Sequence, residues 1–181
     1  MVTYSAAVLQ YAVTSKKTIM VFIAHMGGPF WSRKDNGGWS LPKGEFVPAE
    51  ETAVVAAARE FQEEIGVGVD LGSLIAFGEF RQPSGKVISV FLNECDAPNT
   101  KFIQSNEFEM EWPRGSGNIR SFPEIDRADW FSLATAREKL LKGQRPILDK
   151  LLTHAQERHG EVNEGELSSK GFSEPSQSSL F

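Results

Sequence analysis

The 181-residue sequence contains a single cysteine, Cys95. One thiol excludes an internal disulfide and a metal site built from several cysteines, so any metal must be held by oxygen or histidine ligands. The sequence also lacks an apolar run of the ~18 residues needed to cross a bilayer, and its N-terminus lacks the basic flank of a secretory signal. These absences predict a cytoplasmic protein without a membrane partner.

A surplus of basic residues is missing as well, because 19 lysines and arginines stand against 24 aspartates and glutamates, which gives a net charge of −5. Binding to a nucleic-acid backbone normally requires a clustered basic surface, so the sequence predicts no nucleic-acid partner. A small polyphosphate is still a suitable ligand if a divalent cation neutralises its charge.

The length of the chain and its 40% of hydrophobic residues suffice for one hydrophobic core rather than two. After His159 the composition shifts to serine, glutamate and glycine, with hardly any bulky residues until Leu180. Such a composition buries too little apolar surface to order itself. We therefore expect one domain over residues 1–159 and a disordered tail over residues 160–181.

Two pairs of segments have the composition of β-hairpins. Residues 4–13 and 18–24 are apolar and rich in β-branched residues, and a polar stretch separates them. Residues 74–80 and 86–92 flank a Pro-Ser-Gly turn in the same way. Residues 27–44 are rich in glycine and proline, so we expect loop there, with at most a short strand at residues 39–41.

Residues 106–112 alternate strictly between glutamates and bulky apolar residues. This pattern predicts a half-buried strand that presents three carboxylates on one side. The carboxylates belong to Glu107, Glu109 and Glu111, and they also suit the solvated face of an ordinary strand.

The longest helical pattern lies between Pro48 and Gly66, residues that favour the start and the end of a helix. Two further helices are expected near the C-terminus, over residues 132–141 behind the capping residue Ser132 and over residues 146–154 behind Pro146. In the central helix the residues at the spacing of a buried face are Val54, Ala58, Phe61 and Ile65.

The central helix also carries an acidic stripe. Glu60 and Glu64 lie one turn apart on the same face, and Glu63 lies beside them. Crowded carboxylates repel one another unless a counter-charge is present, and Mg²⁺ prefers oxygen ligands of this kind. The spacing therefore indicates a divalent-cation site, although the stripe taken alone also matches the solvated face of a surface helix.

Residues 59–67, with the sequence REFQEEIGV, resemble the Nudix box, in which Arg-Glu-U-x-Glu-Glu-x-Gly-U (U is a bulky apolar residue) follows a glutamate and an upstream glycine, here Gly44. The flanking residues 39–44 and the pair Trp130 and Phe131 are similar to those of family members. The resemblance implies an α/β/α sandwich of the α+β class with a mixed sheet. It also implies a magnesium-dependent hydrolase, with Mn²⁺ as a substitute, that cleaves a phosphoanhydride bond in a nucleoside triphosphate, a dinucleoside polyphosphate or an ADP-ribose-like compound.

Residue roles follow from the same resemblance. The metal ligands implied are Glu60, Glu63, Glu64 and the main-chain carbonyl of Lys43. Family members bring a further carboxylate from a later segment, for which Glu109 is the candidate, with Glu107 and Glu111 as alternatives. The residues expected to carry the reaction are Arg59, which orients the glutamates, Glu63, Glu64 and Glu109. Positive charge for the substrate phosphates is expected from Arg33, Lys43 and Arg81.

The chain departs from the box at one point. Five residues after Gly44 leads to Glu50, whereas seven residues before Arg59 the glutamate is Glu51, so one extra residue stands inside the motif. Register within a helix is rigid and loop length is not. We therefore place the extra residue in the loop at residues 45–50 and expect Glu51, rather than Glu50, to be the motif's helix-anchoring glutamate.

Three further readings stay open. The altered spacing also suits a Nudix-fold module that binds a nucleotide without cleaving it. Pro83 stands sixteen residues after Val67, where the family associates a proline with ADP-ribose substrates. The terminal residues 177–181 resemble the short motif by which bacterial proteins dock on the replication sliding clamp. The sequence does not indicate an oligomeric state.

Overall fold

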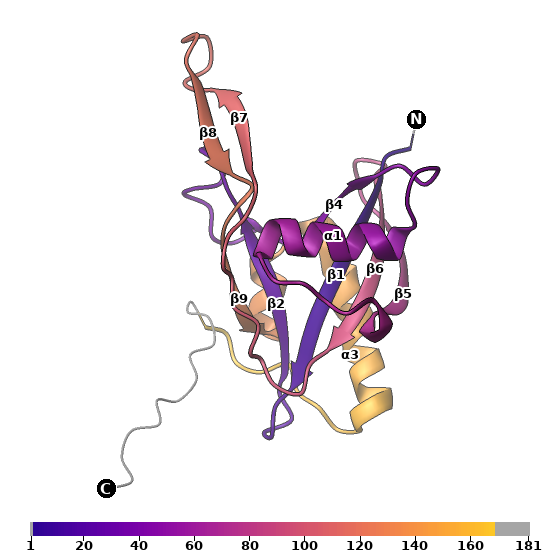
Figure 1. Ribbon diagram of the computed structural model, residues 1–181. Coiled ribbons are helices and arrows are strands. Elements are labelled where there is room, and N and C mark those ends of the chain that lie inside the picture. Colours follow the sequence, from indigo (N-terminus) through magenta and orange to yellow (C-terminus); the bar gives the residue numbers. More distant parts are fainter. Residues whose placement is uncertain (1, 169–181) are drawn as a thin grey trace, which may run out of the picture.

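The centre of the fold is the parallel pair of strands β1 (Tyr4–Val13) and β6 (Val87–Glu94), shown in Figure 1, in a computed structural model that describes residues 2–168. Ala6 and Val8 of β1 face one helical layer, Ala7 and Leu9 face the other, and all four are fully buried. A strand that is covered on both faces is apolar throughout, which explains why β1 shows no alternation in its sequence.

Strands β1 and β2 (Ile19–Met26) pair only beside their shared turn, from Tyr11↔Val21 to Val13↔Ile19, and then diverge. Beyond this point β4 (Lys43–Phe46) pairs with the free edge of β1. Strand β2 is flanked by β3 (Trp39–Ser40) and β9 (Ile125–Ser132). Within the described residues the sheet has seven strands and is mixed, because β1 and β6 are parallel. The remaining strand of this sheet is β5 (Ile75–Arg81), which pairs with β6.

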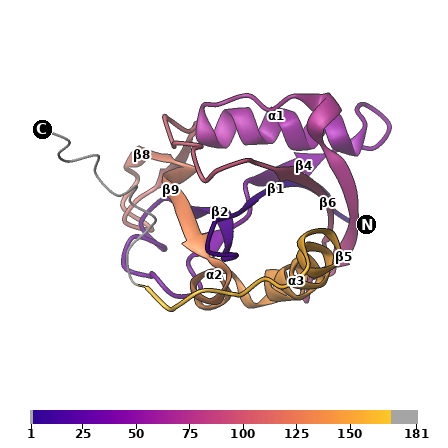
Figure 2. The same ribbon diagram turned by 90° about the horizontal axis from the view of Figure 1, so that it is seen from below.

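Helices cover both faces of the sheet (Figure 2). Helix α1 (Ala53–Ile65) lies on one face, and α2 (Leu133–Lys139) and α3 (Arg145–His159) lie on the other. Short 3₁₀ turns at Leu71–Ser73 and Lys142–Gln144 connect these elements. The α/β/α sandwich with a mixed sheet is thereby confirmed.

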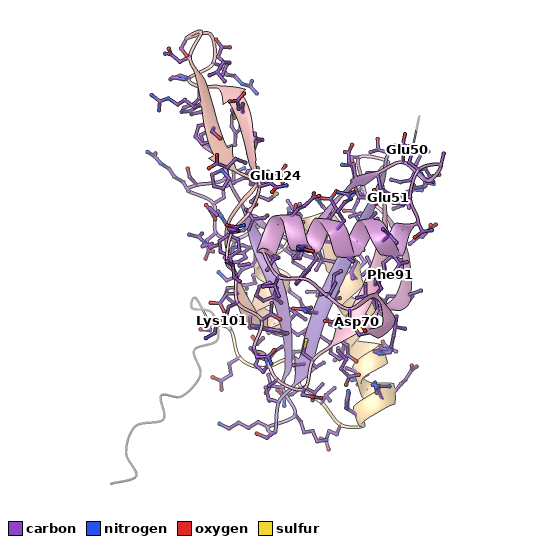
Figure 3. The ribbon with its side chains drawn as sticks, in the orientation of Figure 1. Glu50, Glu51, Asp70, Phe91, Lys101 and Glu124 are labelled. Atoms are coloured by element: carbon purple, nitrogen blue, oxygen red, sulfur yellow. The ribbon has the colours of Figure 1, made fainter. Side chains whose placement is uncertain are left out.

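Helix α1 is held by an apolar layer beneath it. Phe61 and Ile65 are fully buried against β1 and β2, and Phe91 of β6 joins the same layer (Figure 3). Gly66 ends the helix in the left-handed conformation, with φ of 82°. The buried face is rotated from the expected one, because Val54 and Ala58 are only partly buried.

The predicted hairpins and both C-terminal helices are confirmed, and α3 runs on to His159. Ser132 caps α2 by accepting a hydrogen bond from the backbone of Thr135. The strands that the sequence did not reveal are β4, β8 (Ile119–Pro123) and β9. Their polar and charged residues interrupt the apolar pattern, and they are defined by pairing with distant segments.

The acidic strand expected at residues 106–112 is β7 (Glu107–Glu111), which pairs with β8 alone. The two form a hairpin that extends away from the main sheet (Figure 1). No helix within residues 2–168 is long and apolar enough to cross a membrane.

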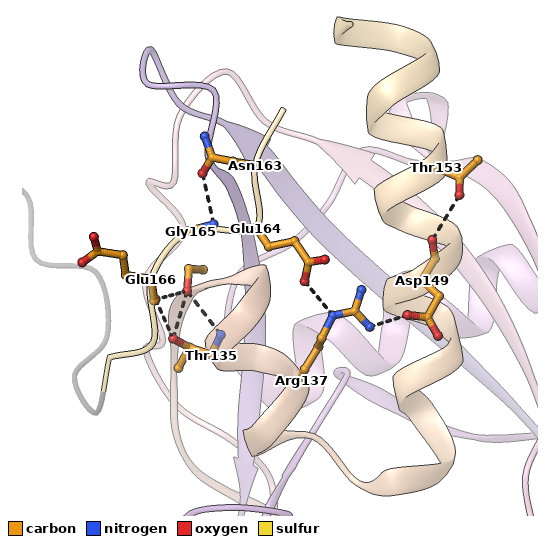
Figure 4. A network of polar contacts seen from close by, with 9 residues as sticks. Thr135, Arg137, Asp149, Thr153, Asn163, Glu164, Gly165 and Glu166 are labelled. Carbon is orange, nitrogen blue, oxygen red and sulfur yellow. Dashed lines mark hydrogen bonds and ion pairs between the residues drawn. The ribbon is translucent and has the colours of Figure 1, made fainter. Parts of the chain in front are cut away.

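Residues 160–168 pack on the domain, so the boundary expected at His159 is too early (Figure 4). Asn163 bonds the hydroxyl of Thr18 and the carbonyl of Lys16, and Glu164 pairs with Arg137, which also contacts Asp149. Specific polar contacts hold this segment, and composition does not reveal them. Residues 169–181, and the expected sliding-clamp motif at 177–181, lie outside the described residues.

Asn163→Ala should lower the free energy of unfolding by about 1–3 kcal/mol, because two side-chain hydrogen bonds to residues 16 and 18 and one to the backbone of Gly165 are lost. Thermal denaturation measures this change. The matched control Glu161→Ala, at an exposed position of the same segment, should change stability by less than about 0.5 kcal/mol. Equal melting temperatures for the two variants would mean that the segment does not hold the domain together.

Candidate active site

The candidate site lies where β4 meets α1. A Cβ atom built on Gly44 of β4 would lie 1.9 Å from the carboxyl carbon of Glu60, so only glycine lets the strand approach the helix this closely. Both Glu60 and Glu64 are 9% exposed. Their burial contradicts the reading of the acidic stripe as an ordinary solvated helix face.

Arg59 is the cation that holds the acidic side chains together. Its Nη1 donates to Glu60 at 2.7 Å and to Glu63 at 3.1 Å. On the other side its Nη2 and Nε donate to the two oxygens of Glu51, at 2.7 and 3.3 Å. The guanidinium therefore orients three carboxylates without occupying all of their oxygens, as a planar fork of five donors can.

Glu51, the glutamate expected to take the motif role, pairs with Arg59. Helix α1 begins at Ala53, so Glu51 and the extra residue both lie in the segment before the helix. The backbone N–H groups of Glu50 and Glu51 both donate to the carbonyl of Val47. This turn accommodates the extra residue and leaves Glu50 exposed.

Glu64 is the carboxylate with the strongest electrostatic perturbation. Its Oε2 accepts a hydrogen bond from the backbone N–H of Lys43 at 2.9 Å. Burial raises its pKa to about 8, against the attraction of Lys43, and the neighbouring charges of Glu60 and Glu124 add to the rise. Burial likewise raises the pKa of Glu60, while Arg59 lowers it. The site therefore holds more negative charge than its cations neutralise.

Glu124 is the functional candidate that the sequence did not reveal. It links β8 to β9, lies above the helix in Figure 3, and its charge acts on both Glu60 and Glu64. Its backbone N–H donates to the carbonyl of Asn106, whose own N–H donates to the carbonyl of Glu63. No local pattern marks this position, because long-range pairing alone brings it to α1.

The acidic strand does not lie at the site. Glu109 is exposed on the hairpin that extends from the body. Glu107 accepts a hydrogen bond from Ser121, and Glu111 accepts one from the backbone of Gly117, so both serve the hairpin itself. Glu124, in contrast, acts through its charge on both Glu60 and Glu64. It therefore replaces Glu109 as the candidate for the carboxylate from a later segment.

Of the three cations expected to meet phosphates, Lys43 lies beside Glu64. Arg33 is exposed on the loop between β2 and β3. Arg81 is exposed at the end of β5, separated from β4 by β6 and β1. The geometry thus brings Lys43 to the acidic side chains and leaves Arg33 and Arg81 at the periphery.

The donor set suits a hard divalent cation, because the carboxylates are buried, their pKa values are raised, and too little positive charge surrounds them. Within residues 2–168, no three aspartate, glutamate, histidine or cysteine side chains are already arranged around a common point. The ion pairs of Arg59 and the bond from Lys43 to Glu64 hold the carboxylates in their present positions. Chemically, the arrangement can bind a cation and accept a proton.

A family model described as the NUDIX domain matches residues 4–151. None of the curated proteins matches the sequence. A solved NUDIX hydrolase from Alicyclobacillus acidocaldarius is 16% identical, with a TM-score of 0.56, and the match covers 92% of this chain and 99% of that one.

Two further structures share the fold. An ADP-ribose pyrophosphatase from Streptococcus suis is 15% identical, with a TM-score of 0.56 and coverage of 90% of this chain and 98% of that one. The NUDIX domain of Shewanella oneidensis NrtR, complexed with ADP ribose, is 12% identical, with a TM-score of 0.55 and coverage of 85% and 88%. At these identities the likeness concerns the fold.

The pKa of Glu64 predicts a pH-dependent stability of the metal-free protein. The pKa of Glu64 is about 8 in the folded state, against an ordinary value of 4.5. Between these pH values the carboxyl is protonated in the folded state but ionised in the unfolded state. The stability that this group contributes is fully present below the unfolded-state pKa and is lost as the pH rises through the folded-state pKa. The melting temperature in a chelator should therefore fall between about pH 4.5 and pH 8, and Glu64→Gln should flatten this fall. An unchanged slope in that variant would contradict the assignment.

Proposed function

Since the chain belongs to the Nudix hydrolase family, whose members cleave phosphoanhydride bonds, we propose that it is a magnesium-dependent pyrophosphohydrolase acting on a nucleoside diphosphate derivative. The observation that carries the proposal is the burial of Glu60 and Glu64 against Gly44, at 9% exposure each. Carboxylates on a merely solvated helix face would not be buried with so little compensating charge.

Glu60, Glu63 and Glu64 would hold the cation, together with the main-chain carbonyl of Lys43. When bound, Mg²⁺ supplies charge that neutralises the substrate phosphates and activates water as the nucleophile, and Mn²⁺ is an acceptable substitute. Arg59 positions Glu60 and Glu63 through its hydrogen bonds. The ammonium of Lys43 attracts the phosphates, as Arg33 and Arg81 would if substrate extends to them.

Glu124 is the group we assign to proton transfer. Its side chain is solvent-exposed, so it can exchange a proton with bulk water after each turnover. Its backbone is fixed on both sides, because its N–H donates to Asn106 and its carbonyl accepts from Gly27. A fixed backbone and a free carboxylate are what a general base needs.

ADP-ribose-like compounds are the preferred substrate class. Pro83 stands at the position associated in the family with such substrates, and two structures of the same fold carry ADP-ribose in their names as substrate or ligand. Pro83 lies in the turn between β5 and β6, where it approaches Gly143. A residue in this turn can contact the part of the substrate that lies away from α1.

A second candidate function is a nucleotide-binding module without turnover. The extra residue before Glu51 favours it, because the loop that carries it borders the site. The NUDIX domain of NrtR, which binds ADP ribose, has the same fold. A ligand-induced rise in melting temperature with no product from any substrate would identify such a module.

Purified protein with Mg²⁺ should release nucleoside monophosphate from ADP-ribose faster than from nucleoside triphosphates or dinucleoside polyphosphates, with products identified by chromatography. Glu64→Gln should lower kcat by about 10²–10⁴-fold, because a metal ligand is lost. Glu50→Gln is the matched control, since Glu50 is exposed, and it should keep normal turnover. A full panel without product would contradict the proposal.

Glu124→Gln should lower kcat by about 10²-fold or more with a smaller change in KM, because proton transfer is lost while the metal ligands remain. Glu109→Gln, the same change on the neighbouring hairpin, should leave both constants unaltered. Steady-state kinetics at saturating Mg²⁺ separate the two variants. If Glu109→Gln were the damaging one, the assignment of Glu124 would be wrong.

A further inference from the structure

His25, the penultimate residue of β2, is fully buried and has polar partners on both sides of its ring. Its Nδ1 lies 2.6 Å from a carboxylate oxygen of Asp126, and its Nε2 lies 2.6 Å from the main-chain carbonyl of Lys34. Both partners are acceptors. A neutral imidazole has one N–H and could satisfy one of them, whereas an imidazolium donates to both.

The charge of such an imidazolium would be balanced locally. Asp126 supplies the opposite charge at hydrogen-bond distance. The ring of Trp39 packs edge-on against His25, and the cations that face this tryptophan, Lys139 and Arg127, lie over its ring. Lys139 is itself neutralised by both carboxylate oxygens of Asp35.

The two bonds of His25 join separate parts of the site. Lys34 belongs to the loop between β2 and β3, which also carries Arg33. Asp126 belongs to β9, two residues after Glu124. The N–H of Gly27, at the start of the loop, donates to the carbonyl of Glu124. The loop is thus bound to the Glu124 segment at its start and, through His25, near its middle.

We propose that His25 is a positioning residue for substrate binding: donating from both ring nitrogens, it fixes the loop that carries Arg33 and Lys34 to the strand that follows Glu124. The inference rests on the proposed hydrolysis of a nucleoside diphosphate derivative, because it assigns the loop to the phosphates of that substrate. The second proton of His25 depends on Asp126, because without that carboxylate a neutral ring can keep its one N–H on Nε2, where it still donates to the carbonyl of Lys34.

Two amide substitutions separate the bonds of His25. The amide of asparagine reaches about as far as Nδ1, and that of glutamine about as far as Nε2. His25→Asn keeps a donor for Asp126 and loses the hydrogen bond to Lys34 in the loop. With the best substrate of the activity test, KM should rise about tenfold while kcat stays within about threefold. His25→Gln keeps a donor for Lys34, so its KM should stay within about threefold of the unsubstituted protein.

Asp126→Asn tests whether the carboxylate is the reason for the second proton. Without it a neutral ring can keep Nε2–H for the carbonyl of Lys34 while Nδ1 accepts from the introduced amide, so NMR should show one N–H on His25 and KM should stay within about threefold. His159→Asn is the matched control. His159, the last residue of α3, also pairs with a carboxylate, that of Glu94, at 2.7 Å. Its kinetic constants should not change.

Nitrogen-15 NMR of the histidine rings near neutral pH tests the protonation directly, with His25→Gln identifying the resonances. Two N–H groups on His25 would support the proposal, and a neutral ring would overturn it. Equal KM values for His25→Asn and His25→Gln, or two N–H groups on His25 in the Asp126→Asn variant, would also overturn it. An unsubstituted protein without turnover contradicts the proposed function instead, and NMR still decides the state of His25.

Discussion

The site depends on one interaction, the sharing of Arg59 among carboxylates that would otherwise repel one another. Glu51, Glu60 and Glu63 all accept hydrogen bonds from this guanidinium. Like charges at helical-neighbour spacing destabilise a helix, more so when they are partly buried. Because Arg59 takes one oxygen each of Glu60 and Glu63, the carboxylates are oriented while part of their coordination capacity stays free.

A relay of backbone hydrogen bonds carries this arrangement into the rest of the fold. The carbonyl of Glu63 accepts from Asn106, the carbonyl of Asn106 accepts from Glu124, and the carbonyl of Glu124 accepts from Gly27. These bonds connect the end of α1 to the base of the hairpin and to the end of β2. The relay also satisfies a C-terminal carbonyl of α1, which lacks a partner within the helix.

Local features of the fold were predictable because they depend on neighbouring residues. The glycine that ends α1 and the capping role of Ser132 are of this kind. Glu124 and Asn163 were not predictable, because each acquires its role from a partner far away in the chain. The alternation of β7 correctly indicated a strand, but periodicity does not tell whether a strand joins the main sheet.

The pairing of Glu51 with Arg59 shows which variations such a site tolerates. An extra residue inside α1 would rotate every later glutamate by about 100° and separate the acidic stripe from Gly44. The same residue in the turn at Val47 changes only the path by which the chain enters the helix. The proposed cation binding would therefore constrain the helix register, whereas the preceding loop is free to adapt to the substrate. Differences in specificity between proteins of this fold should accordingly arise in the loops around an unchanged acidic helix.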